Sequence, residues 1–527
     1  MQSTWTSGAT PPSSDPVVHL LQRFTYGPTQ QLVAEVRSVG IDAWFEGQLD
    51  HLSIADSEVD DFISKWDMFN YIHKDVNFLW ALAESEGDDK AGQIFNSNWM
   101  AGRVLHLYTV IRQARSKRQI YEMMVELWHD HLNITTLGDD TKDGHLDWNT
   151  NDWNKKVIRQ FALSRFEDLL QVSALHPAMI VYLDGELSTK DVPNENYGRE
   201  LLELHTVAPK AGYTQADVVD ASKLFSGLRV KWPARYYDRG RMPRLPNNSS
   251  LIDLPDFASM IHTQRQNFGT FKVMGWQRTV TSVSEVLPAI KSLLSYLSGH
   301  PETAKTIALK LGRRFVDDVP SQQFIDDVSA AYLASNSDIK ATLRAVYKHQ
   351  DFMKSIGTKL KRPGEDYVSV ARALDVWPNF SRLETWKGIT KDFAFISPIA
   401  RWEMSQMGQV PLSWPFPDGY PDVATAWVNA NSQVFRWNIY GNFVRGGSWN
   451  PPAWDRLFPV RERNVESHIN QVAQSLLFSE LGSADRSSLK NAVTKAFGSN
   501  PNWDANSRDI TSLIARLIFQ LPVWSLR

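Results

Sequence analysis

Apolar side chains recur at helical spacing along most of this chain, and this period constrains the fold more than any other feature. Two stretches, one near residue 160 and one near residue 310, each place their apolar residues on a single helical stripe. The stripes are formed by Val157, Ile158, Phe161, Ala162, Phe166, Leu169 and Leu170, and by Ala304, Ile307, Ala308, Leu311 and Phe315. The sequence predicts a mainly α, multi-helix protein with a few short β-hairpins in long loops.

The length of the chain predicts two helical lobes, because one hydrophobic core rarely serves more than about 300 residues. The chain has 527 residues. We expect a flexible tail over 1–15 and an N-terminal lobe over 16–231. An irregular connection over 232–275, whose first part is rich in Pro, Gly, Asn and Arg, would lead to a C-terminal lobe over 276–527.

Charge and composition exclude several classes of protein. The 56 basic and 59 acidic residues give a net charge of −3, so no whole-chain field attracts nucleic acid. The absence of cysteine excludes disulfides, thiolate ligands and cysteine nucleophiles. No apolar run reaches the length of a membrane span. Residues 1–14 lack the features of a secretory signal, so either the protein is cytoplasmic or a signal has been removed.

The first segment that could carry chemistry is RQIYEMMVELWHDHLN, residues 118–133. On a helix, Glu122, Glu126 and His129 share one face, and Glu126-x-x-His129 has the spacing of two ligands to one metal. His131 reaches that side only if the helix ends near Asp130. The alternative is that both histidines are structural groups, hydrogen-bonded at a helix end.

The second segment is PNENYGRELLELHT, residues 193–206, in which acidic residues accompany core leucines. Glu195, Arg199 and Glu200 are candidate catalytic residues, and Glu203 and His205 are candidate metal ligands. Because guanidinium cannot coordinate a metal, Arg199 would orient carboxylates, and Arg199→Lys should lose function. A solvated helix face with salt bridges is the alternative. We expect segments 122–131 and 194–205 to pack together, with His129 and His205 mattering more to a metal than His131.

Other signals are weaker. Asp139, Asp140, Asp143, His145 and Asp147 crowd one loop, but their spacing is not that of an EF-hand and favours a solvated acidic loop. The nucleophile elbow, the Walker loop and the dinucleotide loop are missing. The 20 tryptophans indicate either a large aromatic core or a groove of rings that stack on sugars.

Several blocks of the chain resemble a known family in order. They include HLLQRFTYGPT (19–29), ELWHDHLN (126–133), PNENYGRELLELHTVAPKAGYTQADVVDASKLFSG (193–227) and KLKRPGEDYVSVARAL (359–374). The long third block is similar to the signature of the bacterial family called domain of unknown function 1800. The resemblance implies a mostly helical protein without an agreed activity, export from the cell and a sulfatase-like partner. His262-Thr263 departs from the family's usual His-Asp.

Three functions follow as hypotheses. In the first, a Zn, Fe, Mn or Cu ion activates water or oxygen, and its ligands are Glu126, His129, His131, Glu203 and His205. In the second, paired glutamates act on a glycan without a metal, and Trp rings bind the sugars. In the third, the protein is a non-catalytic surface or assembly protein whose polar helix faces lock two lobes together. The sequence names neither substrate nor metal.

Overall fold

The computed structural model describes residues 7–77, 97–135, 146–232, 258–380, 385–386, 389–390, 398–459 and 461–527. Within these ranges most regular structure is helical, and the strands form three two-stranded antiparallel sheets. The prediction of a mainly α protein with short hairpins is therefore confirmed. No helix in these ranges is long and apolar enough to cross a membrane.

The helices before residue 230 run in short, closely connected pieces. They are α1 (Pro16–Phe24), α2 (Gln30–Val39), α3 (Ile41–Leu49), α4 (Ser57–Ser64), α5 (Asn70–His73), α8 (Ser97–Arg115), α9 (Gln119–His131), α10 (Leu146–Trp153), η4 (Asn154–Arg159), α11 (Phe166–Leu175), α12 (Pro177–Tyr182), α13 (Glu195–Glu200), η6 (Leu201–His205) and α14 (Gln215–Leu224).

The strands and the remaining helices complete the fold. The sheets pair β1 (Leu228–Val230) with β2 (Ser259–Ile261), β3 (Gly269–Val273) with β4 (Trp276–Val280), and β5 (Thr385–Trp386) with β6 (Ile389–Thr390). The helices are α16 (Val283–Ser298), α17 (Pro301–Phe315), α18 (Gln322–Ala334), α19 (Ile339–Lys348), α20 (Gln350–Lys354), α21 (Pro363–Ala373), η10 (Pro398–Met404), α23 (Ser405–Met407), α24 (Ala430–Arg445), α25 (Trp454–Leu457), α26 (Val465–Leu477), α27 (Ser483–Phe497) and α28 (Trp503–Phe519).

Two helix starts follow from local sequence signals. Pro301 occupies the first turn of α17, and the side chain of the preceding His300 accepts a hydrogen bond from the backbone N–H of Glu302 at 3.2 Å. At α14, Thr214 and Asp217 form a reciprocal capping box. Each cap satisfies backbone donors that a helix start would otherwise leave unpaired.

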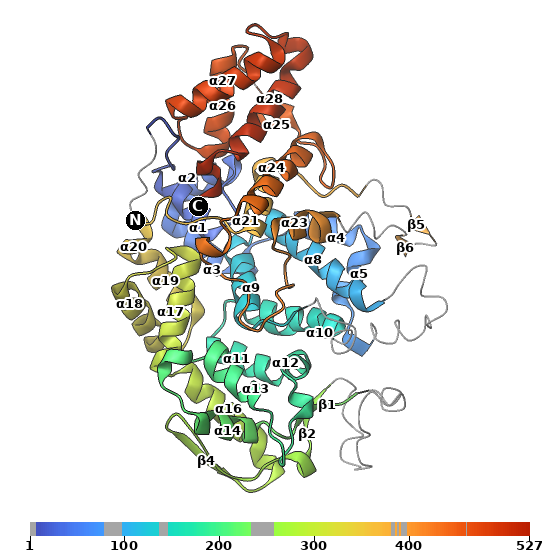
Figure 1. The fold of residues 1–527 in the computed structure, drawn as a ribbon, viewed down its shortest axis with the longest axis vertical. Coiled ribbons are helices and arrows are strands. Elements are labelled where there is room, and N and C mark those ends of the chain that lie inside the picture. The colour runs from blue at the N-terminus through green and yellow to red at the C-terminus, as the bar shows by residue number, and fades with distance from the viewer. Residues whose placement is uncertain are drawn as a thin grey trace.

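The molecule is elongated, with α9 near its middle (Figure 1). Helices α26, α27 and α28 lie at one end, and α14, α16 and the β3–β4 hairpin lie at the other. Buried apolar side chains form one continuous cluster that includes residues from Val17 to Trp524. The division into two lobes at 232–275 stays a prediction.

Both ends of the described chain pack against distant elements. Gly8 accepts a backbone hydrogen bond from Ala484 of α27 at 2.9 Å, so part of the predicted tail over 1–15 is packed. The last residue, Arg527, is buried, and its backbone N–H donates to the Lys359 carbonyl at 2.9 Å. The C-terminus therefore reaches the middle of the molecule, beside the start of α21 (Figure 1).

All π-helical segments among the described residues border α9 or the cavity beside it. They are η4 after α10, η6 after α13, and η10 before α23. Segment η4 packs on α9, His205 of η6 accepts a hydrogen bond from His131, and Met404 of η10 lines the cavity next to α9. Wide turns of this kind shift the phase of a helix and often occur at functional sites.

Candidate functional site

Helix α9 carries the first predicted segment and is almost entirely buried. Its first carboxylate, Glu122, accepts two hydrogen bonds from the guanidinium of Arg159 in η4, at 2.9 and 2.8 Å. This bidentate pair satisfies both carboxylate oxygens. Glu122 therefore serves to fix Arg159 against α9.

Glu126, one turn later, is surrounded by donors. The Tyr26 hydroxyl donates to it at 2.8 Å, and the guanidiniums of Arg314 and Arg362 form ion pairs with it. Burial and the nearby Glu126 charge raise the pKa of Tyr26 well above its usual value. Glu126, predicted as a metal ligand, is thus bound by cations of this chain.

Asp130 is the next carboxylate on this face, and it shares a partner with Glu126. Arg362 contacts Asp130 through Nη1 at 2.7 Å and Glu126 through Nη2 at 2.9 Å. Burial raises the pKa of Asp130 to about 6, although the Arg362 charge opposes that shift. One guanidinium therefore holds two carboxylates close together, one of them titrating near neutrality.

A wider network of charges surrounds this pair. Arg314 also contacts Glu365, which pairs with the C-terminal Arg527 at 3.2 Å. Lys359 contacts Asp422 at 2.7 Å. Burial alone would raise the pKa of both Asp422 and Glu365, but the surrounding cations outweigh this effect. The charge of Lys359 contributes most to lowering the pKa of Asp422. The charge of Arg314 contributes most to lowering the pKa of Glu365, which falls to about 2. The network joins α9, α17, α21 and the C-terminus.

His129 lies on the same helix and contacts η4. Its Nε2 is 2.7 Å from Nδ2 of Asn154, and its Nδ1 has no partner in the described structure. Burial, together with the charge of Arg159, lowers the pKa of His129 to about 3. The imidazole is therefore neutral at physiological pH.

His131 and His205 bring the two predicted segments together. Nε2 of His131 lies 3.1 Å from the backbone carbonyl of His205, so it donates to that oxygen. Both imidazoles are buried, and burial lowers the pKa of His131 well below its usual value and that of His205 to about 3. Nδ1 of His131 and Nε2 of His205 have no hydrogen-bond partner among the described residues.

Among the described residues, no hydrogen bond or ion pair joins the remaining candidates of the second segment to these histidines. The side chains of Arg199 and Glu195 are 40% and 48% exposed and lie 3.7 Å apart, and both bond to the side chain of Gln215. Glu203 accepts a hydrogen bond from Tyr213 at 3.0 Å. Burial raises the pKa of Glu200, and the neighbouring Glu203 charge adds to the effect. The segments meet at their ends, while these polar side chains have local partners.

A metal site is not assembled within the described residues, where no three His, Asp or Glu side chains group as ligands. The acidic loop with Asp139, Asp140, Asp143 and His145 lies outside the described residues, and so does the side chain of Asp147.

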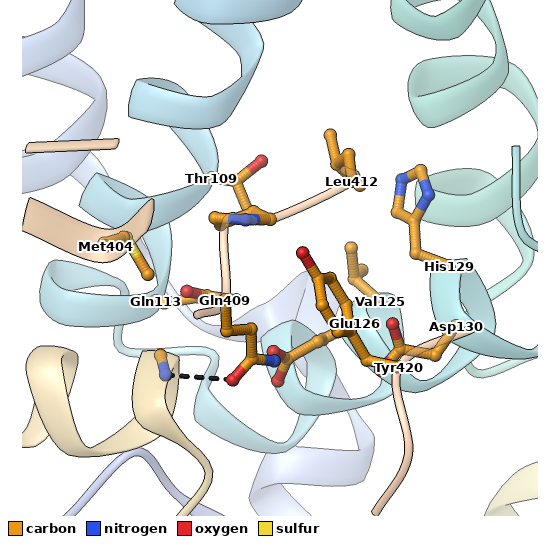
Figure 2. Close-up of a pocket in the computed structure, with 12 residues that line it drawn as sticks. Thr109, Gln113, Val125, Glu126, His129, Asp130, Met404, Gln409, Leu412 and Tyr420 are labelled. Atoms are coloured by element: carbon orange, nitrogen blue, oxygen red, sulfur yellow. Dashed lines mark hydrogen bonds between the residues drawn. The ribbon is translucent and has the colours of Figure 1, made fainter. Parts of the chain in front are cut away.

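A small cavity of about 20 Å³, with room for about one water molecule, lies beside α9. Figure 2 shows its wall: Glu126, His129 and Asp130 come from α9, and Thr109 and Gln113 come from α8. The segment 409–424, which we call the strap, supplies the facing residues Gln409, Pro411, Leu412 and Tyr420. The cavity thus combines carboxylates, an imidazole, hydroxyls and amides with apolar surface.

The strap is fastened at both ends. Oε1 of Gln409 accepts from the Gly364 N–H at 2.9 Å, as the dashed line in Figure 2 marks, and Asp422 pairs with Lys359. In between, Gly419 lies on α9, and a Cβ there would sit 1.8 Å from the Asp130 carbonyl oxygen. Its φ of +72° also favours glycine. The close approach places the strap over the end of α9.

Aromatic rings run along the strap from the surface to the cavity. The exposed ring of Phe416 lies 5.9 Å from that of Trp414, and Trp414 lies 5.0 Å from Tyr420, whose side chain lines the cavity. Trp427 continues the row at 6.0 Å from Tyr420. Of the two tryptophans in this row, Trp414 is partly buried and Trp427 is buried, and a role in stacking on sugars stays a prediction.

Sequence reasoning missed the residues that complete this site. Asp130 lies inside the quoted segment but was not selected, although its position four residues after Glu126 places it on the same face. Arg362, Gln409 and Tyr420 come from distant parts of the chain, and only the fold brings them to α9.

The comparison with protein families finds one match that covers nearly the whole chain. The profile described as "Protein of unknown function (DUF1800)" matches residues 19–526. The chain belongs to the DUF1800 family. A search of the curated proteins finds no match, and a search of the solved structures finds none either. For this DUF1800 protein, the family resemblance predicted from the signature is therefore confirmed, and its chemistry has to be argued from the site.

Proposed function

We propose that this protein is an enzyme that cleaves glycosidic bonds in the cavity between α8, α9 and the strap. One observation carries the proposal: Glu126 and Asp130 line the same cavity and are held by one guanidinium, that of Arg362. Glycosidases commonly use two carboxyl groups near one bond, one as an acid and one as a charged partner. In this form of the glycan hypothesis, the pair is Glu126 and Asp130 of α9 in place of two glutamates.

Asp130 is the acid in this proposal. With a pKa raised to about 6 by burial, part of its population carries a proton near neutral pH, as a general acid requires. Its proton would pass to the leaving oxygen as the glycosidic bond breaks, and water would add to the sugar carbon and give up one proton to Asp130, which restores the acid. Glu126 would stabilise the positive charge that develops on the sugar ring.

The strap supports a carbohydrate substrate. Sugar rings present apolar faces as well as hydroxyls, and aromatic side chains cover the apolar faces. The row Phe416, Trp414 and Tyr420 leads from the surface to the cavity wall, where Thr109 and Gln409 offer polar groups to hydroxyls. The strap would have to move outward to admit a sugar ring.

The test is the release of reducing ends from a panel of polysaccharides by the purified full chain. Asp130→Asn should lower kcat/KM by at least about 10²-fold on any active substrate, as expected for loss of a general acid. Glu203→Gln, a matched loss of one carboxylate outside the cavity lining, should retain activity. Full activity of Asp130→Asn in a folded protein would overturn the proposal.

A metal-dependent enzyme is the second candidate, and one observation favours it. His131 and His205 are adjacent, and each has a buried nitrogen without a partner among the described residues. Neutral imidazole nitrogens are good ligands for Zn, Fe, Mn or Cu. Metal content measured in wild type, His131→Ala and His205→Ala tests this candidate. Loss of a near-stoichiometric metal in both variants supports it, and a metal-free wild type after metal-supplemented expression removes it.

The proposed partner is a polysaccharide chain. Export and a sulfatase-like partner protein are further proposals, which rest only on the family resemblance. Co-purification of the full chain with a sulfatase-like protein from its own cells would test that partnership.

A further inference from the structure

A chain of polar contacts links His129 to Glu122 through two side chains of η4. Glu122 accepts two hydrogen bonds from Arg159, whose Nε donates to Oδ1 of Asn154 at 3.0 Å. The Asn154 amide then lies 2.7 Å from Nε2 of His129. Glu122, Asn154 and His129 are each at most 3% exposed.

The direction of every hydrogen bond in this chain is fixed by chemistry. Arginine has donors only, so the Asn154 atom that faces Arg159 is the oxygen. The Asn154 nitrogen must then face His129 as a donor, and Nε2 of His129 must accept. A neutral imidazole that accepts at Nε2 carries its proton on Nδ1. The contacts therefore select one tautomer of His129.

The π-helical turn explains why these groups align. Asn154 and Arg159 are the first and last residues of η4, five positions apart. In a regular α-helix residues five apart point in different directions, whereas the wider π turn brings them onto one side. The wide turn therefore lets the arginine reach the asparagine and Glu122 at once.

We propose that Asn154 is a positioning residue that holds His129 as the neutral Nδ1–H tautomer, which makes His129 a hydrogen-bond donor to a substrate oxygen in the cavity. The assignment of this tautomer depends only on the chain of hydrogen bonds, whereas its action on a substrate rests on the proposed function. A consequence concerns the metal hypothesis: the lone pair on Nε2 of His129 is occupied by the Asn154 N–H, so His129 in this state is not a ligand.

The tautomer can be measured directly. The full chain labelled with ¹⁵N at histidine gives nitrogen shifts that distinguish a protonated from a bare ring nitrogen, and His129→Gln assigns the signal. Wild type should show protonated Nδ1 and bare Nε2. Asn154→Asp keeps an acceptor for Arg159 but presents only oxygen to His129, so it should move the proton to Nε2.

Asn151→Asp is the control, because it adds a buried carboxylate to the adjoining helix α10 while leaving Asn154 in place. It should leave the His129 tautomer unchanged. Protonated Nε2 in wild type, or an unchanged tautomer in folded Asn154→Asp, would overturn the positioning role.

Activity separates this inference from the proposed function. In Asn154→Asp we expect kcat to fall about 10²-fold with little change in KM, as when one preorganised donor is lost. An inverted tautomer with unchanged kcat would overturn the role in catalysis but leave the glycosidase proposal standing. Full activity of Asp130→Asn would instead overturn the glycosidase proposal and leave the tautomer assignment intact.

Discussion

The two Glu- and His-rich segments look alike in sequence but occupy different environments. In α9, Glu122, Glu126 and Asp130 are tied to arginines from elsewhere in the molecule, and the last two line a cavity. In α13, Glu195 and Arg199 are partly exposed at the surface and pair with each other and with Gln215. A high density of ionisable residues in the sequence therefore does not identify a functional site. Burial of these residues and partners from distant elements are better indicators of one.

The largest expected effect comes from breaking the buried network of α9. Arg362→Met would remove the cation that contacts Glu126, Asp130 and Glu365 together. Glu126 and Glu365 keep Arg314, whereas Asp130 loses its ion pair, and removal of one member of a buried ion pair costs about 3–5 kcal/mol. Urea denaturation should show this loss in the free energy of unfolding. An Arg362→Met protein as stable as wild type would contradict the assigned network.

Acidification should act on the buried histidines of these segments. The folded pKa values of His129 and His205, about 3, lie below the ordinary 6.5. Their stability contribution is therefore present above pH 6.5 and is lost as pH falls toward 3. At pH 5 each of these imidazoles should lower the free energy of unfolding by about 2 kcal/mol relative to neutral pH. Asp130, whose folded pKa is raised, offsets about 1 kcal/mol of that loss. A free energy of unfolding that is flat between pH 7 and 5 would contradict these assignments.

The strap provides a test that leaves the network intact. Phe416→Ala removes an exposed ring from the aromatic row, while its partners Trp414 and Tyr420 stay. Loss of one stacking contact of about 1 kcal/mol should raise KM on an active polysaccharide about fivefold, with kcat nearly unchanged. Phe268→Ala, at an exposed ring next to β3 and absent from the cavity lining, is the control. Equal KM values in the two variants would argue against a sugar platform on the strap.

The smallest effect is expected on α13. Arg199 is partly exposed and bonds to Gln215 at the surface, so Arg199→Lys should change the free energy of unfolding by less than about 0.5 kcal/mol. It should also leave activity unchanged, in contrast to the loss of function expected from sequence. A loss of activity in this variant would return the second segment to the candidate site.

These contrasts indicate how far the sequence could be interpreted. The helical period is a local feature of the sequence, and it was predicted. The His300-Pro301 start of α17 and the Thr214–Asp217 capping box depend on equally local signals. The contact of the two segments was also predicted, and it is confirmed at His131 and His205.

The site itself depends on features that no local pattern reports. Arg362 and Tyr420 lie more than 200 residues after α9 in the chain, and they reach it only in the folded protein. The π turns at η4 and η6 also change which side of the helix the following residues occupy, whereas the predicted helix faces assumed a regular α-helix. Asn154 gains its role through such a turn, and a sequence pattern based on regular helices could not select it.

The most direct test of the account is a comparison of Asp130→Asn with Glu203→Gln, one carboxylate from each segment, in polysaccharide cleavage. Both proteins should fold with the circular dichroism spectrum of wild type. We expect Asp130→Asn to lose at least about 10²-fold in kcat/KM and Glu203→Gln to keep wild-type activity. Loss of activity in Glu203→Gln with full activity in Asp130→Asn would contradict it and would place the chemistry on the second segment.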